Sequence, residues 1–97
     1  MIPANADRAY LEQHYALKVE DLGKTLHTVD GVPSWVRVHR LSAQYLTADY
    51  KTKTLTTYLE ILSDKATDEL IASKVDGLVN SLKLEILKRE ERDTKHG

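Results

Sequence analysis

The chain has 97 residues, which is enough for one hydrophobic core and too few for two, so we expect residues 1–97 to form a single domain. Hydrophobic residues make up 41 % and charged residues 30 %, a globular composition that excludes a disordered chain. Cysteine is absent, which excludes a disulfide framework and a thiolate zinc site. No apolar run approaches the ~20 residues of a membrane-spanning helix, and the N-terminal residues do not resemble a secretory signal. We expect a cytoplasmic protein without membrane contact.

The N-terminal third has the apolar spacing of an amphipathic helix. Apolar residues recur at intervals of three and four positions, at Leu11, Tyr15, Val19, Leu22, Leu26 and Val29. Asn5 is a suitable N-cap, and Gly31 followed by Pro33 would end the helix. This pattern predicts one long helix, with Gly23 as its weakest position.

The next segment predicts a second helix over residues 33–48. Pro33 suits the first turn of a helix because its N–H would have no partner there. An apolar stripe follows, formed by Trp35, Val38, Leu41, Tyr45 and Ala48. We expect Trp35 to be buried between the first two helices.

Residues 50–62 give conflicting signals. Their threonines and tyrosines favour a strand, whereas Leu55, Tyr58 and Leu62 lie at helical spacing. A single strand would find no partner among the predicted helices. We therefore expect a helix here, with a kink or an irregular turn near residues 48–52.

The C-terminal third predicts the longest helix, over residues 65–92. Its apolar stripe consists of Ile71, Val75, Leu78, Leu82 and Ile86. A helix of this length measures ~42 Å, which is long for a compact domain with a radius of gyration of ~13 Å. We therefore expect these five residues to form a homodimer interface, and residues 93–97 to be a frayed tail. The predicted fold is all-α: a small antiparallel bundle of three to four helices with a long C-terminal helix.

Motifs that carry chemistry are missing from the sequence. It has no glycine-rich phosphate loop, no nucleophile elbow and no HExxH motif. The four histidines stand at least 12 positions apart, and the acidic pairs occupy neighbouring helix positions that do not face each other. We expect no catalytic activity, no metal site and no cofactor.

Only the middle third of the chain is basic. Between residues 31 and 59, Arg37, Arg40, Lys51 and Lys53 are opposed by Asp49 alone. Gly23 and the turn before Ser34 also form a loose helix-turn-helix pattern. The alternative function is therefore a small DNA-binding regulator of helix-turn-helix type that uses residues 33–53, with these four cations as the nucleic-acid contacts.

The favoured interpretation is a non-enzymatic interaction or regulatory protein. It would act by binding an unidentified protein partner, as a homodimer through the C-terminal helix. Two observations favour it over DNA binding: the flanking thirds are each net acidic, and the apolar spacing already explains the aromatic residues near the arginines.

Overall fold

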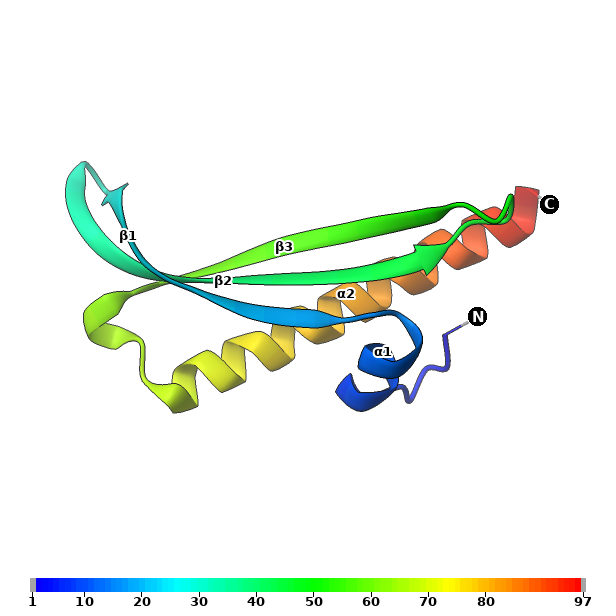
Figure 1. Ribbon diagram of the computed structural model, residues 1–97, viewed down its shortest axis with the longest axis horizontal. Helices are drawn as coiled ribbons and strands as arrows, with labels where there is room; N and C mark the ends of the chain where they lie inside the picture. Colours follow the sequence, from blue (N-terminus) through cyan, green and yellow to red (C-terminus); the bar gives the residue numbers. More distant parts are fainter. Residues whose placement is uncertain (1, 97) are drawn as a thin grey trace.

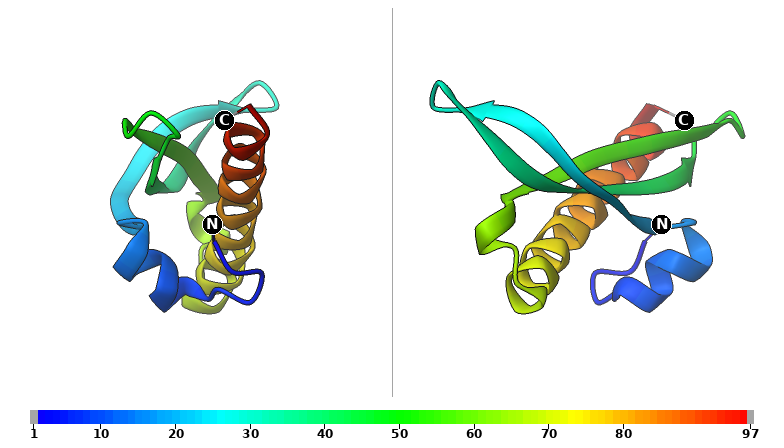
Figure 2. Two further views of the ribbon diagram at one scale, coloured as in Figure 1. Left: turned by 90° about the vertical axis from the view of Figure 1, so that its right-hand side faces the viewer. Right: turned by 60° about the vertical axis from the view of Figure 1, so that its left-hand side comes forward.

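The computed structural model describes the backbone of residues 2–96 and the side chains of residues 2–91. It contains a short helix, three strands, a 3-10 turn and a long helix: α1 (Arg8–His14), β1 (Lys18–Val29), β2 (Val32–Leu46), β3 (Thr52–Leu62), η1 (Ser63–Lys65) and α2 (Asp68–His96). The strands form an antiparallel sheet in the order β1-β2-β3, and both helices lie on one side of it (Figures 1 and 2). The predicted all-α bundle is therefore wrong, and the chain has an α+β fold.

A two-residue turn at Asp30 and Gly31 replaces the predicted end of a helix. Both residues have positive φ angles, of 51° and 80°, as a type I′ hairpin turn requires. Val29 and Val32 pair on either side of the turn. Asp-Gly adopts this turn at low cost, and it therefore joins β1 to β2 directly.

A β-bulge interrupts β1 in its middle. The pairing with β2 shifts register between Asp21 and Gly23, and Gly23 takes a φ of 81°. The Gly23 N–H donates to Oδ1 of Asp21 at 2.8 Å, which stabilises the bulge. The extra residue reverses the alternation of side chains along the rest of β1.

The predicted third helix is strand β3. It pairs with β2 from Val36↔Leu62 to Leu46↔Thr52, so the partner strand that the sequence analysis missed is β2. Between β2 and β3, Thr47 N donates to Lys51 O at 2.8 Å and Tyr50 N donates to Thr47 O at 3.0 Å. This turn lies where an irregular segment was expected.

The hydrophobic core lies between the sheet and α2. Alternate residues of β2 point toward the helix, and we call this face the helix side of the sheet. Leu41 and Ile86 are both 0 % exposed there. The other buried core residues come from the N-terminal segment, α1, the strands and α2: Ile2, Ala6, Leu11, Leu17, Ala43, Tyr45, Leu59, Val75, Val79 and Leu82.

The N-terminal segment is fastened to α2. Lys83 Nζ donates to the carbonyl oxygens of Ala4 and Ala6 at 3.1 and 3.2 Å. Asp7, rather than Asn5, caps the first helix, since its Oδ1 accepts from Tyr10 N at 2.9 Å. These contacts hold α1 against α2 on the helix side of the sheet.

Helix α2 is the long C-terminal helix that the sequence predicts, and its backbone remains helical to His96. The expected frayed tail, residues 93–97, lies outside the described side chains, and residue 97 lies outside the described backbone. Within the described residues, no helix is both long and apolar enough to cross a membrane.

Candidate interaction surface

The β1–β2 hairpin extends beyond the rest of the sheet. At this end β2 and β3 last pair at Val36↔Leu62, whereas β1 and β2 stay paired as far as Val29↔Val32. Residues 26–35 therefore form a two-stranded ribbon, which we call the arm (Figures 1 and 2). The molecule measures 49 × 25 × 18 Å, with a radius of gyration of 15.7 Å. A compact domain of this length would have about 13 Å, so the protein is elongated, and the arm lies at one end of it (Figure 1).

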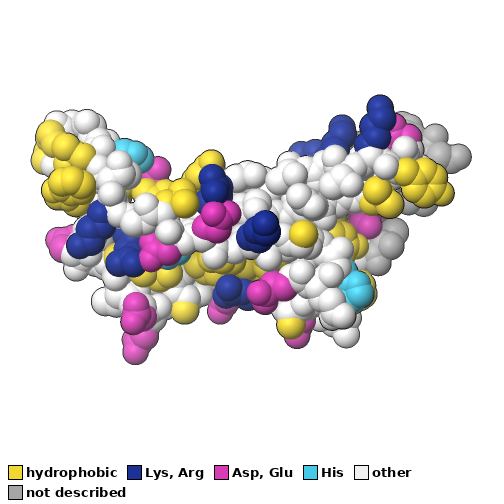
Figure 3. Space-filling model, in the orientation of Figure 1, with side chains coloured by type: hydrophobic (Ala, Val, Ile, Leu, Met, Phe, Trp, Pro, Cys, Tyr) yellow, Lys and Arg dark blue, Asp and Glu magenta, His cyan; other side chains and the backbone are white. Residues whose placement is uncertain are grey.

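Apolar side chains are exposed on the arm and at its base. On the arm, Trp35 is 59 %, Leu26 53 % and Val32 60 % exposed, and Leu22 and Tyr58 are about half exposed beside its base. Figure 3 shows apolar side chains gathered on the projecting end at the left. Scattered exposed apolar residues are normal, but a cluster on one projecting element is typical of a binding surface.

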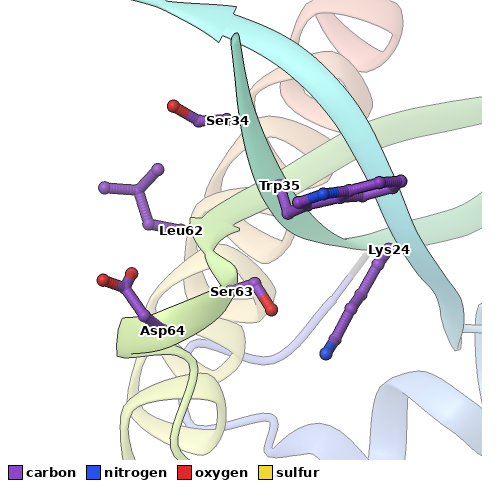
Figure 4. Close-up of a pocket in the computed structure, with 6 residues that line it drawn as sticks. All are labelled: Lys24, Ser34, Trp35, Leu62, Ser63 and Asp64. Atoms are coloured by element: carbon purple, nitrogen blue, oxygen red, sulfur yellow. The ribbon is translucent and has the colours of Figure 1, made fainter. Parts of the chain in front are cut away.

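A cleft of about 800 Å³ separates the arm from the body of the protein. Lys24, Ser34 and Trp35 of the β1–β2 hairpin line one wall, and Leu62, Ser63 and Asp64 line the other, the body wall (Figure 4). We call it the arm cleft. An indole ring, a leucine, two hydroxyls and one charge of each sign together resemble the lining of a protein–protein interface.

The opposite face of the hairpin has a second hollow, of about 410 Å³. It is mostly apolar and is lined by Leu22, Thr25, His27, Val38, Tyr58 and Glu60. His27 Nδ1 lies 3.2 Å from Glu60 Oε2 and ties β1 to β3 at this point. The base of the arm is thus hollowed on both of its faces.

The edges of the arm are poorly suited to strand addition. Pro33 has no N–H to offer on β2, and Ser34 Oγ donates to Val32 O at 3.2 Å. On β1 the bulge at Asp21 and Gly23 disturbs the edge just before the arm begins. Prolines and bulges are the devices by which edge strands avoid pairing with other chains. We therefore expect a partner to contact the side-chain faces of the arm.

The four cations proposed as nucleic-acid contacts do not converge. Arg37 Nη2 donates to Asp21 Oδ2, and Arg40 Nη2 donates to Glu20 Oε2 at 2.9 Å. The hydrogen bond from Arg37 lowers the pKa of the Asp21 carboxyl. Since 37 and 40 differ by an odd number, the two arginines lie on opposite faces of β2.

The two lysines of that set lie at the other end of the sheet. Lys51 belongs to the β2–β3 turn, 3.7 Å from Asp49, and Lys53 is near the start of β3. Residues 33–53, predicted to bind DNA through a helix at 33–48, form β2, this turn and the start of β3. They contain no helix that could enter a DNA groove.

The predicted dimer stripe packs inside the chain itself. Val75, Leu82 and Ile86 are buried in the core, and Ile71 and Leu78 are partly buried against it. The sheet of the same chain therefore covers the stripe, which removes the reason to expect an interface there. Trp35, predicted to be buried between two helices, is instead the most exposed aromatic side chain of the arm.

Potential metal ligands do not cluster among the described residues. No three His, Cys, Asp or Glu side chains there come together in a way that could hold a metal ion. His39 is buried on the helix side, and its Nδ1 has no hydrogen-bond partner. On the sheet, His39 pairs in register with Asp21 of β1, whose carboxylate is ion-paired, and with Leu59 of β3, which belongs to the core.

No protein-family model matches the sequence, and no curated protein or solved structure shows significant similarity to it. The apolar side chains of the arm and of its cleft remain uncovered by the rest of the described chain.

Proposed function

We propose that the protein is a non-enzymatic interaction protein that binds another polypeptide through the arm. The observation that carries this proposal is the exposure of Trp35, Leu26 and Val32 on the arm, which is not paired with β3. Leaving such a side chain in water forfeits about 1.5–3 kcal/mol relative to burying it. Tryptophan is also among the residues that most often dominate the binding energy of an interface.

The charge distribution favours a polypeptide over a nucleic acid. The chain has a net charge of −1, whereas nucleic-acid-binding domains are usually basic. Arg37 and Arg40 are each already paired with a carboxylate of β1. On composition, we propose the cytoplasm as the compartment.

Site-specific photocrosslinking tests the proposal. A photoreactive phenylalanine derivative at Leu26 places the probe beside Trp35, with which Leu26 pairs in register, and the same probe at Tyr50 is the control at the opposite turn, since both positions are exposed. Irradiation in an extract of the source cells should link the Leu26 probe to a polypeptide far more strongly than the Tyr50 probe. The added substitution Trp35→Ser should remove that product. Crosslinks to nucleic acid, or equal products from both probes, would refute the proposal.

A further inference from the structure

We infer that two copies of this chain associate by pairing their β3 strands edge to edge, in antiparallel orientation, about a two-fold axis at Thr54. The inference concerns a different surface from the arm and does not depend on the proposed function. It also moves the expected homodimer away from the apolar stripe of α2, which packs in and against the core of its own chain.

Strand β3 is an edge strand with few features that prevent pairing. It lies at one end of the strand order β1-β2-β3, so its outer side pairs with no other described strand. Its 11 residues include no proline and no glycine, and its register with β2 is continuous. The other edge strand, β1, is interrupted by the bulge between Asp21 and Gly23. An unprotected edge is a template for a further strand, and of the two described edges β3 is the less protected.

Three threonines of β3 point away from α2, on the side that we call the open face of the sheet. Leu55 and Leu59, at odd-numbered positions of β3, pack in or against the core. Thr52, Thr54 and Thr56, at even-numbered positions, therefore lie on the open face, and all three are exposed. When β3 pairs with a second β3 about Thr54, Thr52 of each copy faces Thr56 of the other, and Thr54 faces its own equivalent.

This threonine pattern selects a second copy as the partner. Threonines directly opposite each other on one face of an antiparallel pair hydrogen bond through their hydroxyls and stabilise the pairing. An axis at Thr56 would lose two of the three matches, because Thr52 would face Glu60 and Thr54 would face Tyr58. The spacing in β3 is thus complementary to itself about Thr54, and an unrelated strand has no reason to match all three positions.

Pairing of this kind closes at two copies. It uses both β3 edges and leaves only the bulged β1 edges outside, so the same contact cannot add a third copy. Thr54 pairs with Gln44 near the β2–β3 turn, whereas the arm lies at the opposite end of the molecule (Figure 1). The two arms therefore lie far from the axis and remain available to another polypeptide.

The dimer should be weak and should tighten with salt. Residues 52–56 of each copy form a paired segment of about 17 Å, so the buried area falls below the ~1,200 Å² of stable interfaces. Lys53 lies diagonally across from Lys53 of the other copy, about 7–8 Å away, and lysines on an edge oppose pairing. We expect a dissociation constant on the order of 100 µM at physiological salt. Lys53→Gln should lower it about twofold.

Charge exchange at the axis provides the decisive test. Thr54→Glu places Glu opposite Glu, and Thr54→Lys places Lys opposite Lys, so each variant should dimerise about fivefold more weakly than the wild type in sedimentation equilibrium. An equimolar mixture brings Glu opposite Lys and should recover the wild-type affinity, which an effect within one chain could not produce. Thr28→Glu and Thr28→Lys, at an exposed threonine of the arm, are the matched controls and should dimerise as the wild type does.

Single cysteines give an independent measurement of the register, because the chain has none of its own. Thr54→Cys should form a disulfide-linked dimer under mild oxidation much faster than Thr28→Cys. A wild type that stays monomeric at about 1 mM would overturn the inference. Wild-type dimerisation of both Thr54 charge variants, a mixture that fails to recover, or equal crosslinking of the two cysteine variants would overturn it as well. Circular dichroism verifies that the variants fold.

The two proposals can fail separately. For the Leu26 and Tyr50 probes alike, a crosslink between two copies has twice the mass of one chain and is scored apart from crosslinks to another polypeptide. A monomeric wild type whose Leu26 probe captures another protein would refute the dimer and leave the proposed function standing. A dimeric wild type whose Leu26 probe captures nothing would refute the proposed function and leave the dimer standing.

Discussion

The hydroxyl of Tyr15 donates to the carboxylate of Glu90 and lies 3.2 Å from both of its oxygens, although 75 positions separate the two residues in the sequence. The N–H of Ile2 donates to the same carboxylate at 2.9 Å. Burial, followed by the charge of Glu90, raises the pKa of Tyr15 to about 12. One carboxylate of α2 therefore holds both the N-terminal segment and the residue that follows α1.

This contact predicts a loss of stability at high pH. The pKa of Tyr15 is raised above its ordinary value of 10.0, so its contribution is complete below pH 10 and is lost as the pH rises toward 12. Two pKa units correspond to about 2.7 kcal/mol, but Tyr15 is only partly buried, and we expect about 1 kcal/mol. Urea unfolding at about pH 9 and about pH 11.5 measures the loss. Tyr15→Phe should lose that much less stability between the two pH values; an equal loss in both proteins would contradict the prediction.

Two neighbouring positions of α2 should respond very differently to truncation. Ile86 is 0 % exposed in the core, whereas Leu84 is 47 % exposed on the other side of the helix. Ile86→Ala should reduce the free energy of unfolding by about 2–5 kcal/mol because it leaves a cavity. Leu84→Ala should cost less than about 1 kcal/mol. Chemical denaturation of both variants tests the placement of α2, and similar losses would mean that the helix presents a different face to the sheet.

Glycine-to-alanine substitutions at two positions should have opposite effects. A β-carbon at either Gly31 or Gly77 would meet no atom within 4 Å, so steric clashes with neighbours are not involved. Gly77 lies in α2 with an ordinary φ, and Gly77→Ala should stabilise the protein by about 0.5–1 kcal/mol. Gly31 has a φ of 80°, and Gly31→Ala should destabilise it by about 1–2 kcal/mol. Thermal unfolding measures both changes. Gly31→Asn is the control, because asparagine tolerates this φ; a loss as large as that of alanine would argue against the I′ turn.

Removing the exposed indole should leave the fold almost unchanged. Trp35 is 59 % exposed, so Trp35→Ser should cost less than about 1 kcal/mol of unfolding free energy in dilute solution. A buried tryptophan would instead cost about 3–5 kcal/mol on truncation. The fluorescence emission of the dilute wild type should also lie close to that of the unfolded chain. A strongly blue-shifted emission under these conditions would place the ring inside the monomer.

The long helix could be predicted from the sequence because the apolar residues of its stripe recur at helical spacing and pack in or against the core. Strand β1 could not, because its bulge imitates a helix. Val19 and Leu26 are seven positions apart, which is two helical turns and would place them on opposite faces of a regular strand. They pair with Leu41 and Trp35, which are six positions apart and share one face of β2. The bulge thus produces helical spacing in an extended chain.

The sequence did contain a signal for the hairpin. Asp30-Gly31 lies between two segments rich in threonine and valine, and such a dipeptide is a strong indication of a hairpin turn. Interpreting Gly31 as the end of a helix concealed it and left β3 without a partner. The sequence near Trp35 did not indicate its exposure, because an aromatic residue on a strand has the same sequence pattern whether the strand lies in a core or in an arm. The position at which β3 stops pairing with β2 is set by contacts between residues far apart in the sequence. The residues near Trp35 do not determine it.

Strand β2 runs without interruption from the Asp30–Gly31 turn, through the arm, to the buried residues Leu41 and Tyr45. The arm therefore has no hinge and cannot swing as a separate unit. It can open only by fraying from its tip, and amide hydrogen exchange along β2 should slow progressively from Val32 toward Leu41. A partner that grips the tip would suppress this fraying. Binding of such a partner would be detected as slower amide hydrogen exchange along β2, including the part of this strand that lies in the core.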